Sequence, residues 1–172
     1  MKHRIDEATA AAATPPAIDA RSSWLQALRW GFGAAIGAGA RRIICVDPDF
    51  AHWPLNDATL HGALGAWLRL PQRRLVLLAA HFDELRRQHP RFVVWRRDWV
   101  HAVSAFAAPE ELAGSLPSRL VCDAQVSVQL FDAVHWRGRA DRDPRSAHLL
   151  QVETEASLQH ASPAMAVNVL GL

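Results

Sequence analysis

Cysteine is scarce in this sequence. Only Cys45 and Cys122 occur, and each lies within a short apolar stretch. Two such thiols do not make a disulfide framework, and they are too few for a zinc site built from cysteine pairs. We therefore expect both to be unpaired thiols, buried in strands.

Lysine is almost absent, because Lys2 is the only one, and arginine supplies nearly all of the positive charge. The 19 basic residues are balanced by 17 acidic residues, which leaves a formal net charge of only +2. A nucleic-acid-binding domain usually carries a larger basic excess. The charge balance therefore argues against nucleic acid as a partner.

Long apolar runs are also missing. The least polar stretch, residues 30–40, is too short and too rich in glycine to span a bilayer. The first seven residues lack the apolar core of a signal peptide. We expect a cytoplasmic protein that does not contact the membrane.

The common catalytic and nucleotide-binding motifs do not occur. The chain has no glycine-rich dinucleotide fingerprint after a strand, no phosphate loop and no nucleophile elbow. Its nine histidines are scattered, and none forms the paired-histidine motif of zinc proteases. We expect no cofactor and no bound metal.

The chain has the length of one ordinary domain, with 172 residues. Residues 1–20 combine charges, alanines and two prolines with few large apolar side chains, so we expect them to form a disordered leader. The domain then spans residues 21–160, and residues 161–172 form a C-terminal tail without an assigned structure.

Helix and strand patterns alternate through the first half of the domain. Apolar residues at helical spacing predict helices over residues 22–36, 57–70 and 82–89. Continuous apolar runs predict buried strands over residues 43–46, 75–80 and 92–95. This order is typical of βαβ crossovers and predicts an α/β fold with a mixed, mostly parallel sheet flanked by helices.

The second half has a looser pattern. Residues 99–106 fit either a strand or a helical turn, and residues 109–112 fit a short helix. Extended runs at 120–123 and 126–131 predict an antiparallel hairpin. Residues 135–143 are polar and predict a loop, and Pro144 begins a predicted last helix.

Ligands of open α/β sheets bind beyond the carboxyl ends of the parallel strands. The polar residues that follow the three expected strands are Asp47, Asp49, His52, His81, Arg96 and Arg97. We expect any ligand site to lie among them. The Asp-x-Asp-x-x-His spacing also fits a divalent metal, but carboxylates after a strand more often cap the next turn.

Four arginine pairs stand out along the chain, at residues 41–42, 73–74, 86–87 and 96–97. The first two precede expected strands and the last follows one, so we expect them at opposite edges of the sheet. Trp95 and Trp99 flank the last pair. They fit either stacking on a base or packing in the core, and core packing is favoured because tryptophan buries so much area.

Several segments resemble a known family: residues 41–50, the strand at 74–78, and residues 120–123 followed by Val128 and Leu130. Residues 21 to about 160 are similar to an uncharacterised proteobacterial domain related to one half of the phospholipase D fold. Active relatives carry a His-x-Lys-x4-Asp motif. Before Asp123 this chain has neither the histidine nor the lysine at the required places.

The missing motif removes the nucleophile and the cation of that reaction. The resemblance therefore implies a non-catalytic binding or interaction module, with an anionic small molecule or a protein as its partner. The alternative is a divergent metal-dependent or phosphoryl-transfer hydrolase that uses Asp47, Asp49 and His52. Of these two hypotheses, the sequence favours the module without enzyme activity.

Overall fold

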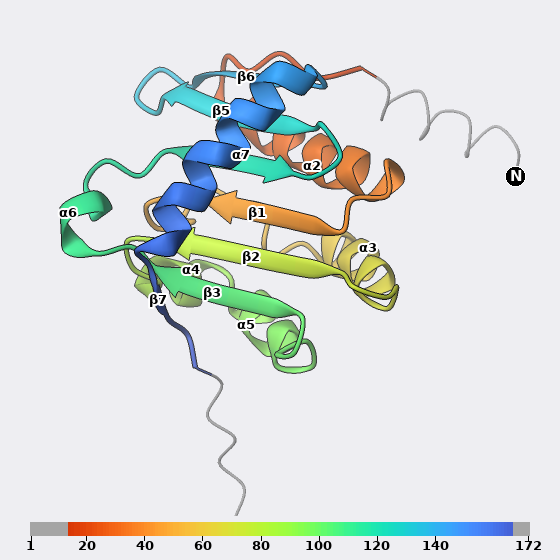
Figure 1. Ribbon diagram of the computed structural model, residues 1–172, viewed down its shortest axis with the longest axis vertical. Helices are drawn as coiled ribbons and strands as arrows, with labels where there is room; N and C mark the ends of the chain where they lie inside the picture. The colour runs from red at the N-terminus through yellow and green to blue at the C-terminus, as the bar shows by residue number, and fades with distance from the viewer. Residues whose placement is uncertain (1–13, 167–172) are drawn as a thin grey trace, which may run out of the picture.

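The computed structural model describes residues 14–166 of the chain (Figure 1). Its centre is a seven-stranded sheet with the order β6-β5-β4-β1-β2-β3-β7. The strands are β1 (Arg42–Val46), β2 (Arg74–Ala79), β3 (Val103–Ala107), β4 (Ser118–Cys122), β5 (Ser127–Asp132), β6 (Arg137–Asp141) and β7 (Ser162–Pro163). The helices are α2 (Arg21–Gly37), α3 (Ala58–Leu68), α4 (Asp83–Gln88), α5 (Pro90–Arg97), α6 (Glu110–Ala113) and α7 (Pro144–Gln159).

The three middle strands β1, β2 and β3 are parallel, as their crossover helices require. Antiparallel strands extend the sheet on both sides: β4, β5 and β6 beyond β1, and β7 beyond β3. The expected α/β class with a mixed sheet between helices is confirmed, and so is the β4–β5 hairpin.

The two faces of the sheet are covered unequally. Alternate strand residues such as Ile43 and Leu75 point to a large core under α2, α3 and α5. Their neighbours Ile44 and Val76 point to the other face, where α7 crosses the strands and contributes Leu150 (Figure 1). Helices therefore flank both faces, as expected, but one face has only a single long helix.

One predicted strand is a helix. Residues 92–95 lie in α5, and the third parallel strand begins only at Val103. Pro90 occupies the first turn of α5, where its missing N–H leaves no intrahelical bond unmade. Phe92 packs into the core from this helix. The contacts between α5 and α3 outweigh the β propensity of Val93 and Val94, which alone would favour a strand.

The two cysteines lie where the sequence indicated. Cys45 on β1 and Cys122 on β4 are buried and unpaired. Burial raises the pKa of the Cys45 thiol well above its usual value and also raises that of Cys122. Both thiols therefore stay protonated, as structural core residues do.

The first described residues belong to the fold. Ile18 is only 6% exposed and forms a bridge with Gly138 of β6. The Ser23 side chain caps the start of α2 by accepting the N–H groups of Asp19 and Ala20. Part of the expected leader therefore packs on the sheet, whereas residues 1–13 lie outside the described residues.

The expected tail also contributes to the sheet. Ser162 and Pro163 form β7 beside β3, and Met165 is buried. The remaining residues of the tail, 167–172, are outside the described part of the chain. Among residues 14–166, no helix has both the length and the apolar character needed to cross a membrane.

Candidate functional site

Asp47 directly follows β1 and organises the turn after this strand. Its carboxylate accepts the hydroxyl of Ser118 and the backbone N–H groups of Asp49 and Phe50, the last at 2.7 Å. Burial raises the pKa of Asp47, although these hydrogen bonds oppose the shift. The side chain is thus committed to closing the turn after β1 and to linking that turn to Ser118 of β4.

The other acidic and histidine residues at this edge point in separate directions. Asp49 accepts the N–H of Ala51, and the exposed His52 ring lies edge-on against Trp136 of the β5–β6 connection, with centroids 5.3 Å apart. His81 is exposed after β2. Within residues 14–166, no cluster of three or more His, Cys, Asp or Glu residues has the geometry of a metal site.

A polar hollow of about 420 Å³ lies beside this turn, between α2 and the end of α4. It is lined by Arg21, Arg29, His52 and Asn56, with His89 at its side. Its cations are partly neutralised, because Arg29 pairs with Asp57 at 3.3 Å. His89 is buried, and its Nε2 lies 2.8 Å from the Phe50 carbonyl oxygen. Like Asp47, it therefore stabilises the turn after β1 through a hydrogen bond.

The two predicted arginines do not join that edge. Arg96 is buried, and its guanidinium donates a 2.6 Å hydrogen bond to the carbonyl oxygen of Met165. Arg97 is exposed at the end of α5, at the opposite edge of the sheet. The structure therefore divides the predicted site residues between two edges.

The amino-terminal edge of the parallel strands collects arginines. Because α5 leads into β3, Arg97 lies at the same edge as the residues before β1 and β2, on the right of Figure 1. The Arg74 N–H donates to the Arg41 carbonyl oxygen at 2.9 Å, and the Arg74 guanidinium donates to the His101 carbonyl oxygen. The expectation that these arginine pairs lie at opposite edges is wrong.

We call this surface the basic edge, formed by Arg41, Arg69, Arg73, Arg74 and Arg97. All but the half-buried Arg73 are exposed. The aspartates of the adjoining turns are Asp98 and Asp123, and Asp123 accepts the N–H groups of Arg41 and Arg42 at 2.9 and 3.2 Å. Five arginines against two carboxylates make this edge locally positive in a chain of nearly balanced charge.

A row of rings runs from α3 past α5 to the basic edge, and we call His61, Trp95, Trp99 and His101 the aromatic row. His61 of α3 stacks on Trp95 with a 15° angle between the planes and 5.3 Å between the centroids. The ring centroids of Trp95 and Trp99 are 6.1 Å apart, and those of Trp99 and His101 are 6.0 Å apart. Trp95 and Trp99 pack against the core but keep part of their surface exposed.

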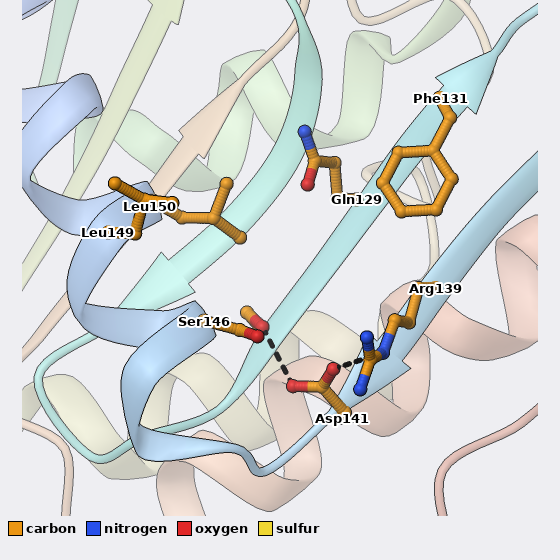
Figure 2. A pocket seen from close by; sticks show the side chains of 8 residues that line it. Gln129, Phe131, Arg139, Asp141, Ser146, Leu149 and Leu150 are labelled. Atoms are coloured by element: carbon orange, nitrogen blue, oxygen red, sulfur yellow. Dashed lines mark hydrogen bonds and ion pairs between the residues drawn. The ribbon is translucent and has the colours of Figure 1, made fainter.

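A small hollow between α7 and the outer strands contains a second group of polar side chains (Figure 2). Its volume is about 130 Å³, and Phe131 and Leu149 form its apolar wall. Asp141 pairs with Arg139 at 2.5 Å and accepts the Ser127 hydroxyl at 3.3 Å. Because these groups satisfy one another, the hollow offers a ligand little unmatched charge.

No protein-family model and no curated protein sequence matches the chain. Among solved structures, the fold is similar to that of TrmBL2, an archaeal chromatin protein whose structure is described as showing a novel mode of DNA binding. The TM-score is 0.53 at 12% identity, and the match covers 80% of this chain but only 51% of that chain. At this identity the likeness establishes the fold, and this chain spans about half of its neighbour.

This likeness corrects two expectations from the sequence. The expected function was a non-catalytic module on a phospholipase D-like fold, or a hydrolase using Asp47, Asp49 and His52, and nucleic acid was argued against as a partner. A DNA-binding chromatin protein shares the fold, so both expectations are wrong. The charge argument used only the net charge, which does not report how the arginines are distributed over the surface. The resemblance to a phospholipase D half stays a prediction.

Proposed function

We propose that this domain binds nucleic acid through the basic edge. The observation that carries the proposal is the convergence of arginines from three successive helix-to-strand connections on one edge. Nucleic acid presents a row of phosphates, and guanidinium groups bind phosphate oxygens through charge-assisted hydrogen bonds. The cytoplasmic location expected from the sequence belongs to this proposal.

A structural role accounts for only part of this charge. Arg69 and Arg97 lie at the carboxyl ends of α3 and α5, where a cation complements the helix dipole. Arg41 precedes β1 and is exposed, whereas Arg73 and Arg74 donate hydrogen bonds to the carbonyl oxygens of Pro71 and His101, which are neutral partners and leave the positive charges unmatched. The excess of arginine at one edge is the pattern expected of a phosphate-binding surface.

The fold likeness supports the proposal in a limited way. The neighbour that shares the fold is described as a chromatin protein that binds DNA, although the shared region is only half of its chain. The carboxyl edge, in contrast, uses Asp47 and His89 to close its own turn. Of these two edges, the basic edge is therefore the better candidate for binding phosphates.

Fluorescence anisotropy with a short labelled duplex, and with one of its strands, tests the proposal. Arg41→Gln, Arg69→Gln and Arg97→Gln together should lower the affinity at least about tenfold at low salt. The slope of log K against log salt should fall by roughly one per lost phosphate contact. Circular dichroism should show an unchanged fold, because all three side chains are exposed.

The matched control removes the same charge elsewhere, through Arg86→Gln, Arg137→Gln and Arg145→Gln, which are also exposed. This triple variant should bind nearly as well as the wild type. An equal loss of affinity in the two triple variants would mean that binding depends only on the net charge, and would overturn the assignment of the basic edge. Absence of binding to either nucleic acid by the wild type would overturn the function itself.

A further inference from the structure

We infer that the nucleic acid recognised is single-stranded, with a base stacked at Trp95 while its phosphates lie on the basic edge. This inference rests on the proposed function and specifies its substrate class. Its basis is the position of the aromatic row, which starts between α3 and α5 and ends at His101, directly before β3. The His101 carbonyl oxygen accepts a hydrogen bond from Arg74, so the row and the basic edge meet there.

The two tryptophans of the aromatic row are more exposed than the tryptophans of the core, and Trp136 in the β5–β6 connection is also partly exposed. Trp24 and Trp67 are 1% and 2% exposed, as expected for rings that serve only the core. Trp95 and Trp99 retain accessible surface although α3 packs beside them. A Cβ added at Gly65 of α3 would be in ordinary van der Waals contact with both rings, 3.5 Å from Trp99 and 3.9 Å from Trp95, so α3 lies directly beside them.

A shallow hollow of about 390 Å³ lies beside Trp95 and is lined by Pro90, Arg91, Val94 and Trp95. Val94 is 60% exposed there and adds apolar surface beside the Trp95 ring. Arg91 supplies a cation to the same hollow and is also exposed. An apolar hollow with an aromatic wall and a neighbouring guanidinium suits a nucleobase attached to a phosphate.

The occupant must present a free base. In a duplex the bases are stacked and paired inside the helix, so their faces cannot reach a ring on the protein surface. Single strands expose these faces, and proteins bind them by combining aromatic platforms with a basic groove. A duplex would engage only the arginines, which predicts weaker binding than for a single strand of the same length.

Anisotropy of the full chain with a labelled single strand, its duplex and an abasic strand of equal length tests this inference. The single strand should bind about tenfold more tightly than either of the others. Trp95→Leu should weaken single-strand binding about tenfold and leave duplex binding unchanged, whereas Trp95→Phe retains a ring and should keep most of the affinity. Phe131→Leu removes an exposed ring far from the basic edge and serves as the control.

The outcomes separate the inference from the proposed function. Equal binding of the single strand and the abasic strand, or a Trp95→Leu effect no larger than that of Phe131→Leu, would overturn base stacking. The proposed function would still stand if the basic-edge triple variant weakened binding to both forms. If that variant changed neither form, the proposed function would fail together with the inference. The abasic comparison uses wild-type protein, so it decides the matter even if Trp95→Leu does not fold.

Discussion

Arg42 of β1 lies directly beside Arg74 of β2 in the parallel strand pair. Adjacent like charges on neighbouring strands repel each other, so each side chain needs a partner. Arg42 pairs with Glu155 of α7, and Arg74 donates to the carbonyl oxygen of His101. Glu155 thereby neutralises one cation next to the basic edge.

Glu155→Gln should therefore increase the affinity for nucleic acid, because it leaves Arg42 free to contact a phosphate. The cost in stability should be under about 1 kcal/mol, since both side chains of the pair are more than one-third exposed. Glu110→Gln, an exposed change on α6, is the matched control and should leave the affinity nearly unchanged. Anisotropy and urea melts measure the two effects, and weaker binding by Glu155→Gln would contradict the role given to Arg42.

Two glycines of α2 should respond oppositely to the same substitution. A Cβ on Gly31 would lie 2.7 Å from Cγ2 of Val128, so Gly31→Ala should destabilise the protein by about 1–3 kcal/mol. Gly33 has open space around it, and Gly33→Ala should stabilise the helix by about 0.5–1 kcal/mol. Thermal melts of the two variants provide the comparison. A stabilised Gly31→Ala protein would mean that α2 does not pack closely on β5.

The sequence located the central strands well because their signals are local. Residues 43–46 and 75–79 are continuous apolar runs bounded by arginines and a turn, and such runs are typical of strands buried on both faces. Residues 92–95 have the same composition but form a helix, since Phe92 and Trp95 meet α3 from one helical face. The residue pattern of this segment alone cannot predict its contact with α3.

The wrong prediction of a strand at residues 92–95 also prevented the sequence from predicting the basic edge. With a strand at 92–95, Arg97 falls at the carboxyl edge, whereas the helix α5 places it with Arg41 and Arg74. The carboxyl-edge residues were located correctly, but the sequence could not show that Asp47 is occupied by the turn that it closes. β6 was expected to be a loop because its residues are polar, yet as an edge strand it needs only one paired side.

Ile18 should contribute to stability although it precedes α2. The side chain is buried against Gly138 at the β6 edge, so Ile18→Ala should cost about 2 kcal/mol, the lower end for core isoleucines. Val134→Ala is the control, because that side chain is 81% exposed. The same argument predicts that removal of residues 1–20 lowers the melting temperature. An unchanged temperature would show that the bridge between Ile18 and Gly138 does not form in solution.

Asp47 should make the protein less stable as the pH rises from about 4 towards neutrality. Burial raises its pKa in the folded state, so the unfolded chain releases this proton first and stability is lost as the pH rises through the folded pKa.

Asp47→Asn keeps an oxygen for the N–H groups of Asp49 and Phe50 and offers an N–H to Ser118, without a charge to desolvate. The difference in unfolding free energy between this variant and the wild type should grow with pH in favour of asparagine. Asp47→Ala should instead cost about 1–3 kcal/mol, because two backbone N–H groups lose their acceptor. Urea melts at a series of pH values decide the matter, and an Asp47→Asn protein that becomes less stable than the wild type at neutral pH would show that the ionised carboxylate has a role beyond closing the turn.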